Sequence, residues 1–220
     1  AEEVGLTFGG HVPAEVGIEH AIETGISTVD HMDGYLEAAL DDATRAVAER
    51  GENVTIDDMV RHLDEGRMRD LARVTRDAGV YVVPTQYLWA NLYGSPDPDA
   101  ALRQPEMNYV SPQQRQAWRN QAAGGPTLDP LTRDLFLRGR DRMLEILGEE
   151  GALLLMGTDS PQLFNVPGFA LHREIRAMAE AGLGNDEILI SGTRNVGRYV
   201  ADELGQDGDF GTVAPGQRAD

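Results

Sequence analysis

Two histidines near the start of the chain and one aspartate far downstream have side chains that bind divalent metal ions. His11 and His31 are 20 positions apart, and Asp159 ends a run of apolar residues. Imidazole nitrogen and carboxylate oxygen are zinc ligands, and a zinc-bound water is a nucleophile at neutral pH. A lone histidine is more often a hydrogen-bonded structural residue. A metal site is therefore expected only if the fold brings these three side chains together.

The elements around these residues predict such a meeting. Residues 6–11 and 26–31 have the pattern of short strands, and the segment between them has helical spacing, with Pro13 in its first turn and Gly25 at its end. A helical crossover joins parallel strands, so both histidines are expected at the carboxyl ends of adjacent strands. Residues 153–156 predict another buried strand, which ends in Asp159 at the same rim.

Five short motifs carry a resemblance to a known family. They are GHVP at 10–13, VDH at 29–31, GTDS at 157–160, GFALHRE at 168–174 and GTVAPGQRAD at 211–220. In this order the sequence resembles the metal-dependent amidohydrolase superfamily, in its imidazolonepropionase and prolidase-like branch. The resemblance implies an α/β fold, a (β/α)8 TIM barrel. It also implies that His11 and His31 are the metal ligands of the fifth and sixth strands, and Asp159 the aspartate of the eighth.

The resemblance covers only the second half of that barrel. The family has a His-x-His pair on its first strand and a metal-bridging lysine on its fourth, whereas this sequence contains no lysine. We therefore expect residues 1–210 to form strands 5–8 with their helices, and residues 211–220 to begin the re-entry into a small β-sandwich. An isolated half of a barrel leaves open strand edges, so the chain is expected to form oligomers or to need the missing N-terminal half. Weak metal binding is expected for the chain alone.

Further elements are expected around this rim. A strand over residues 80–85 would direct Thr85 and Gln86 toward the site, and residues 91–128 are the least regular part of the chain. Helices are expected over 36–50, 55–79, 131–147, 169–181 and 185–204. The arginines of 131–147 are interpreted as a solvated helix face.

Other polar residues receive secondary roles. Tyr35 and Gln86 are candidates for substrate binding, and His172, which belongs to one of the family motifs, is expected to support the Asp159 loop from the second shell rather than to bind metal. Asp30 is expected to point away from His31, because successive strand residues face opposite sides, so a structural role is favoured.

Composition limits the possible partners. The net charge of -18 argues against binding nucleic acid or an anionic membrane surface, both of which need clustered positive charge. Without cysteine, a metal must be held by nitrogen and oxygen ligands. No apolar run approaches the length of a membrane-spanning helix. The sequence leaves the localisation open.

The resemblance implies hydrolysis of an amide or cyclic amide, in a small-molecule substrate such as a dipeptide or lactam. One or two Zn2+ ions would activate water, and Asp159 would take its proton and pass it to the leaving nitrogen. Two alternatives remain: a phosphoesterase or lactonase on the same barrel, because the ligand set does not distinguish carbonyl from phosphoryl centres, and a non-catalytic α/β scaffold with structural histidines.

Overall fold

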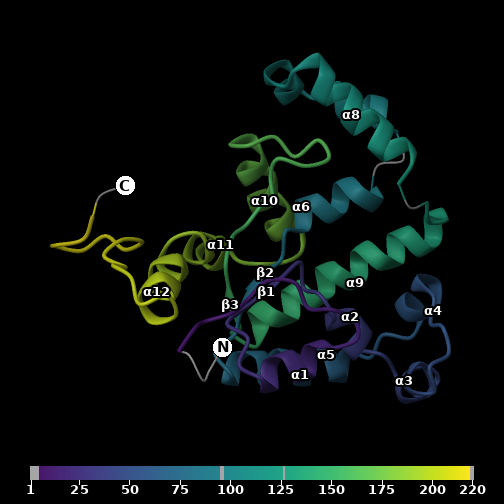
Figure 1. Ribbon diagram of the computed structural model, residues 1–220, viewed down its shortest axis with the longest axis horizontal. Helices are drawn as coiled ribbons and strands as arrows, with labels where there is room; N and C mark the ends of the chain where they lie inside the picture. The colour runs from purple at the N-terminus through teal and green to yellow at the C-terminus, as the bar shows by residue number, and fades with distance from the viewer. Residues whose placement is uncertain (1–4, 95–96, 126, 219–220) are drawn as a thin grey trace.

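A computed structural model describes residues 5–94, 97–125 and 127–218. The chain has an α/β fold in which a small parallel sheet is surrounded by helices (Figure 1). The sheet contains β1 (Thr28–Asp30), β2 (Tyr81–Val83) and β3 (Leu153–Leu154), in that spatial order. Val29 pairs with Val82, which pairs with Leu154, so the centre of each strand is apolar and buried. All three strands therefore end at the same rim.

The strand expected over residues 6–11 is reduced to a single parallel bridge, between Gly10 and Val29. The amide of Gly10 donates to Thr28 O at 3.0 Å, and the amide of Asp30 donates to Gly10 O at 3.0 Å. A Cβ atom at Gly9 would lie 2.1 Å from the Thr28 hydroxyl, so the backbones approach closely here. The predicted parallel neighbour of β1 is present, but it is too short and glycine-rich to form a full strand.

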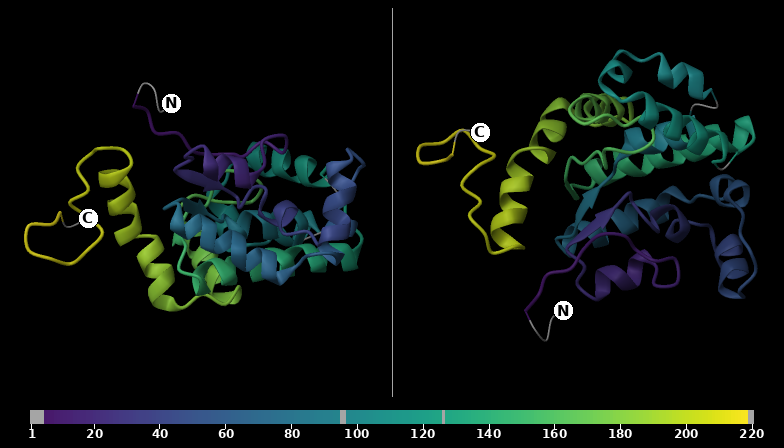
Figure 2. Two further views of the ribbon diagram at one scale, coloured as in Figure 1. Left: turned by 90° about the horizontal axis from the view of Figure 1, so that it is seen from below. Right: turned by 45° about the horizontal axis from the view of Figure 1, so that its top comes forward.

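Helices make up most of the remaining structure (Figure 2). They are α1 (Ile18–Glu23), α2 (Tyr35–Ala38), α3 (Asp42–Glu49), α4 (Ile56–Arg61), α5 (Glu65–Asp77), α6 (Gln86–Trp89), η2 (Ala90–Gly94), α7 (Pro98–Leu102), η3 (Pro105–Tyr109), α8 (Pro112–Ala123), α9 (Pro130–Glu149), α10 (Phe169–Glu180), α11 (Asn185–Ser191) and α12 (Arg194–Asp202). The sheet and α2, α5 and α9 contribute to one hydrophobic core.

Three helices predicted as continuous are broken in the structure. Asp41 and Asp64 each accept a backbone N–H of the helix that follows them, so α3 and α5 begin as new helices. The two breaks lie side by side, joined by an antiparallel bridge between Leu40 and Leu63. The helix predicted over 185–204 likewise divides into α11 and α12. At the first two breaks, local capping side chains thus override the longer apolar period.

Residues 91–128 are more regular than expected, since α7, η3 and α8 form within them. A second hydrophobic cluster joins this segment to the loop that follows Asp159. The Trp118 ring contacts the Phe164 ring edge-on, with centroids 5.9 Å apart. The segment therefore anchors the Asp159 loop from outside the main core.

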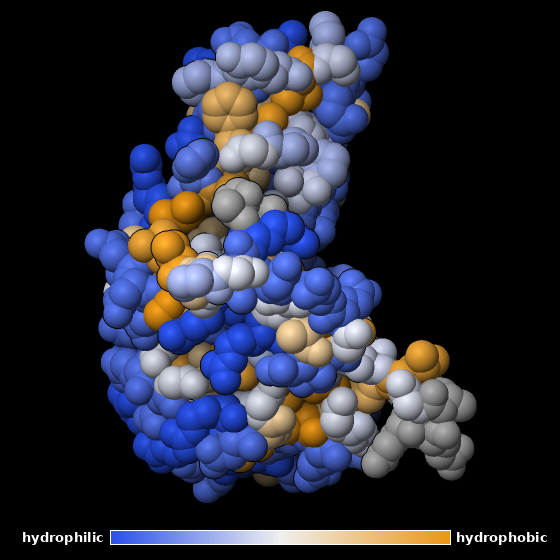
Figure 3. All heavy atoms as spheres, turned by 90° about the vertical axis from the view of Figure 1, so that its left-hand side faces the viewer, coloured by the Kyte–Doolittle hydropathy of each residue, from blue (hydrophilic) through white to orange (hydrophobic). Residues whose placement is uncertain are grey.

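The face seen from the α12 side is mostly hydrophilic, with hydrophobic residues in separate small groups (Figure 3). No helix in the described part of the chain is both long and apolar enough to cross a membrane. Residues 211–218 form no strand and extend beyond α12, while residues 219 and 220 lie outside the described ranges. The β-sandwich re-entry, the half barrel and the oligomer stay predictions.

Candidate metal centre

Three residues that follow the strands share an unusual backbone conformation. His31 comes directly after β1, Thr85 shortly after β2, and Asp159 after β3, with φ angles of 60°, 46° and 53°. Side chains other than glycine rarely adopt this left-handed conformation, which is strained and clusters at functional sites. The rim at the carboxyl ends of the strands is therefore the first place to look for a site.

The two predicted histidines meet at this rim. The ring centroids of His11 and His31 are 4.7 Å apart and the rings are tilted by 34°. One ligand atom from each ring and one carboxylate oxygen of Asp30 all lie within 4.8 Å of one another. The proximity of Asp30 corrects the expectation that it faces away. Because His31 leaves the strand in a left-handed conformation, the alternation of a strand no longer separates the two side chains.

Asp159 reaches the same group from β3. Its Oδ2 atom lies 3.6 Å from His31 Nε2, and Gln162 Nε2 donates a hydrogen bond to the same oxygen. The side chain of Asp159 is 40% exposed, whereas that of His31 is 9% exposed. The structure therefore brings His11, His31 and Asp159 to one rim and adds Asp30 to them. The ligand atoms that lie within 4.8 Å of one another are those of His11, Asp30 and His31, and Asp159 lies beside this group through His31. Imidazole nitrogens and carboxylate oxygens of this kind are ligands of divalent metal ions.

Asp33 orients His11. Its Oδ2 atom accepts a hydrogen bond from His11 Nδ1 at 2.9 Å and from the backbone amide of Val12 at 3.3 Å. The hydrogen bond to Asp33 raises the pKa of His11 above its ordinary value, although desolvation opposes this effect. A carboxylate that holds one imidazole nitrogen leaves the other free for a metal, as is usual around metal-binding histidines.

The tautomer of His31 follows from its partner. His31 Nδ1 lies 2.6 Å from Thr85 Oγ1, and the same hydroxyl donates to Pro84 O at 2.8 Å. With the single hydroxyl proton directed to Pro84 O, His31 Nδ1 carries a proton and donates to Thr85, and this is the tautomer that we propose. Nε2 is then the unprotonated nitrogen and faces Asp159. Desolvation lowers the pKa of His31, which favours this neutral form.

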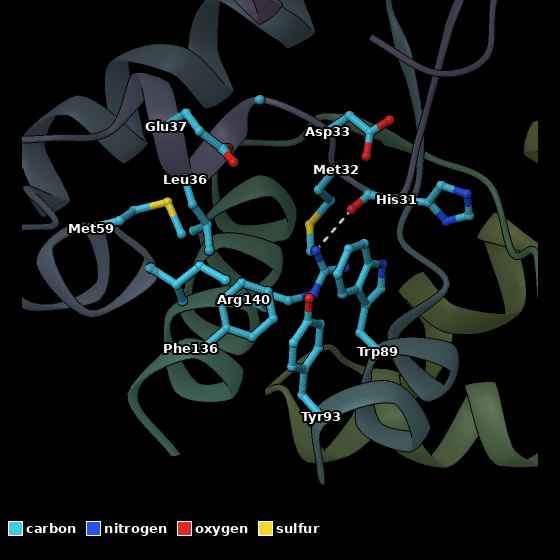
Figure 4. A pocket seen from close by; sticks show the side chains of 12 residues that line it. His31, Met32, Asp33, Leu36, Glu37, Met59, Trp89, Tyr93, Phe136 and Arg140 are labelled. Atoms are coloured by element: carbon cyan, nitrogen blue, oxygen red, sulfur yellow. Dashed lines mark hydrogen bonds between the residues drawn. The ribbon is translucent and has the colours of Figure 1, made fainter. Parts of the chain in front are cut away.

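Arg140 of α9 supports the rim from below. It is 3% exposed, and its guanidinium donates to His31 O at 2.9 Å (Figure 4). The guanidinium also donates to Pro84 O at 3.0 Å. The guanidinium also lies 4.4 Å from the centroid of the Trp89 ring. Burial lowers the pKa of Arg140, and the nearby carboxylates oppose this effect. For Arg140, the expected solvated helix face is wrong, because this side of α9 packs against the ends of β1 and β2.

Glu174 of α10 holds the turn that contains Thr85. It is fully buried, and its two carboxylate oxygens accept the backbone N–H groups of Gln86 and Tyr87, each at 2.8 Å. Burial raises the pKa of Glu174 to about 7, and the two amide hydrogen bonds oppose the shift. The sequence analysis did not single out this residue. Its spacing of four from buried Ala170 and Met178 is the signal that could have found it.

Three further predicted residues lie away from the metal ligands. Tyr35 is completely buried, and its hydroxyl is 2.9 Å from that of Thr75, so it is not offered to a substrate. Gln86 is 3% exposed, and its Nε2 atom donates to Asp141 at 2.6 Å. His172 is exposed on α10. Glu174, two residues further along the same helix, holds the turn after β2 and not the Asp159 loop, so the role expected of His172 stays a prediction.

Comparisons with known proteins give structural likenesses only. No family model matches the chain, and no curated protein matches it. A solved structure described as bottromycin amidohydrolase has a TM-score of 0.61 at 25% identity, over 96% of this chain and 44% of that one. A Xaa-Pro dipeptidase with bound methionine in its active site has a TM-score of 0.51 at 15% identity, over 100% of this chain and 39% of that one.

The chain therefore spans less than half the length of either neighbour. The dipeptidase, at its low identity, shows a likeness of fold alone. The likeness to bottromycin amidohydrolase, at 25% identity, supports a relationship to a hydrolase.

Proposed function

We propose that this chain belongs to a metal-dependent amidohydrolase, in which His11, His31 and Asp159 hold a divalent ion. The observation that carries the proposal is the approach of two imidazoles and a carboxylate at one rim, with 3.6 Å between His31 Nε2 and Asp159 Oδ2. The likeness to bottromycin amidohydrolase supports the same reaction class. The substrate would be a small molecule with an amide, dipeptide or lactam bond.

Zinc fits the residues present. The donors are imidazole nitrogens and carboxylate oxygens, and the chain has no cysteine. The hydrogen bond to Thr85 leaves His31 Nε2 unprotonated, as a metal ligand must be. Asp33 can hold Nδ1 of His11 in the same way. One or two ions would be bound in the whole protein.

When bound, zinc would supply a water of lowered pKa and polarise the scissile carbonyl. The chain's own residues would handle the proton. Asp159, partly exposed at the rim, would accept it from the attacking water and deliver it to the leaving nitrogen. Gln162 holds one oxygen of this carboxylate, which leaves the other oxygen for the proton. Arg140 fixes the backbone on which His31 is carried.

We further propose that the fold is the second half of a (β/α)8 barrel. The parallel bridge at Gly10 and strands β1, β2 and β3 would be strands five to eight, and residues 211–220 would begin the β-sandwich. The shares of the neighbours that the chain covers agree with a half barrel. In the whole protein, ligands from other strands would then complete the centre.

Isothermal titration with Zn2+ tests the proposal. We expect one ion per chain, with a Kd no tighter than about 1 μM because the ligand set is partial. His31→Ala should abolish this binding. His20→Ala, which removes an exposed histidine outside the rim, is the matched control and should leave it unchanged. Equal zinc binding by wild type and His31→Ala would refute the metal centre.

A substrate panel on the whole protein separates the reaction classes. Dipeptides ending in proline, lactams, lactones and phosphotriesters present different scissile bonds to the same centre. We expect turnover of the amide or lactam members. Turnover of only the phosphotriesters or lactones would contradict the amidohydrolase assignment and leave the metal centre intact.

A further inference from the structure

A cavity of about 150 Å³ lies behind the rim, on the other side of the His31 backbone from its imidazole (Figure 4). Its walls come from α2, α4, α9 and the α6–η2 segment, and it is partly open to solvent. Most of the side chains that line it are apolar or aromatic, and they include Leu36, Met59, Trp89, Tyr93 and Phe136. The cavity has no part in the roles proposed for the metal ligands.

Three aromatic rings form one continuous wall. Trp89 and Tyr93 are stacked, with centroids 5.7 Å apart and planes 4° from parallel. Phe136 lies against both, at 5.8 Å from Trp89 and 4.9 Å from Tyr93. Each ring is held by the other two, so the wall is pre-formed. Clefts of this kind bind ligands chiefly through apolar surface and shape.

The cavity and the metal centre share a wall. The Trp89 ring lies edge-on to the His31 ring at 6.3 Å. Asp33 lines the cavity and also binds Nδ1 of His11. Trp89 and Asp33 therefore border both the cavity and the metal centre.

Charges around the cavity limit what it can accept. Asp33 and Glu37 line one part of it, and the guanidinium of Arg140 lines another. A carboxylate would meet the two acids, and an ammonium group would meet the buried guanidinium. An uncharged group avoids both costs. The volume fits a group of about benzene size, because an apolar cavity of roughly 150 Å³ accommodates benzene.

We infer that this cavity is a subsite for an uncharged, apolar side chain of the substrate, up to about the size of a benzene ring. That the occupant is part of a substrate rests on the proposed function. The prediction that the cavity binds a small apolar group does not rest on it, because the aromatic wall of Trp89, Tyr93 and Phe136 contains no proposed metal ligand. The inference therefore predicts binding of a small apolar probe in the absence of metal.

Toluene is the probe, and Trp89 is the reporter. The chain has two tryptophans, so Trp118→Phe leaves Trp89 as the single fluorophore. Metal-free Trp118→Phe should show a saturable change in Trp89 fluorescence on titration with toluene. Adding Met59→Phe fills the cavity and should weaken toluene binding at least about tenfold. Adding Met107→Phe enlarges a buried methionine in the second hydrophobic cluster and should leave the affinity unchanged.

Circular dichroism verifies that each variant is folded. No saturable response in folded Trp118→Phe would overturn the inference even if the filled variant failed to fold. Equal toluene affinity with and without Met59→Phe would overturn it as well. His31→Ala should lose zinc but keep toluene binding, which separates the two proposals. Toluene binding by a chain that binds no zinc would refute the proposed function and leave the apolar binding site standing.

Discussion

The side-chain chemistry of the centre depends on how single hydrogen bonds fix each histidine. In the proposed tautomer, Thr85 gives its one proton to Pro84 O and its oxygen accepts from His31 Nδ1. The hydroxyl therefore selects the tautomer in which Nε2 of His31 is free. The effect is local, because it depends on one hydroxyl and one backbone carbonyl.

Thr85→Val should remove the hydroxyl that selects the His31 tautomer while preserving the shape of the side chain. We expect the nitrogen chemical shifts of His31 to change from one tautomer to a mixture, and the zinc affinity to fall by about 10- to 100-fold, as for other lost partners of metal-binding histidines. Thr75→Val is the matched control, since Thr75 is equally buried but bonds to Tyr35. Unchanged His31 shifts in Thr85→Val would contradict the assignment.

At the residue scale, a position that strand topology decides could be predicted from the sequence, while the roles of these residues stay predictions. His11, His31 and Asp159 could be placed because parallel strands end at one edge. Asp30 was misplaced, because a two-residue period cannot foresee the left-handed conformation of His31. Tyr35 could not be excluded as a ligand-facing residue, because its partner Thr75 is 40 positions away.

At the scale of elements, α9 and α10 supply charged side chains that hold the rim. Arg140 ties β1 to β2 through two carbonyls, and Glu174 caps the turn after β2. The helices themselves were predictable from apolar spacing and caps. The buried charges were not, because their partners are backbone groups from distant parts of the chain.

Glu174→Gln should change how stability depends on pH. The pKa of Glu174 in the folded chain is about 7, above its ordinary 4.5, so the folded state binds this proton more tightly than the unfolded state. Its contribution to stability is therefore full below pH 4.5 and lost as pH rises through 7. Relative to Glu174→Gln, the free energy of unfolding of wild type should fall over that range by up to about 3 kcal/mol.

Urea unfolding at several pH values measures this difference. Glu180→Gln, an exposed position on the same helix, should parallel wild type at every pH. If the free energy of unfolding depends on pH in the same way for wild type and Glu174→Gln, burial does not raise the pKa of Glu174 and the prediction is wrong.

For the molecule as a whole, the excess of acids is the dominant electrostatic feature. The net charge is -18, and many acids pair with arginines on the surface, where such pairs contribute little. Repulsion among the excess carboxylates should then destabilise the folded chain by more than these ion pairs stabilise it. Raising NaCl from about 0.01 M to about 0.5 M shortens the screening length to a few ångström and should raise the Tm. A Tm that falls with salt would show that the ion pairs dominate instead.

The fold as a whole was only partly predictable. Consecutive parallel segments were expected and are present, but β1, β2 and β3 are shorter than the apolar runs suggested. Backbone pairing depends on neighbouring strands as well as on the sequence of each strand. The segment over 91–128 became helical through caps such as Asp97 and Ser111 and through its packing on the Asp159 loop.

Anomalous diffraction at the zinc edge, from crystals of the zinc-loaded chain, tests the central claim most directly. We predict one strong peak within coordinating distance, about 2.0–2.2 Å, of a nitrogen of His11, a nitrogen of His31 and a carboxylate oxygen of Asp159 or Asp30. A peak elsewhere on the surface, or no peak at the rim at saturating zinc, would contradict the account.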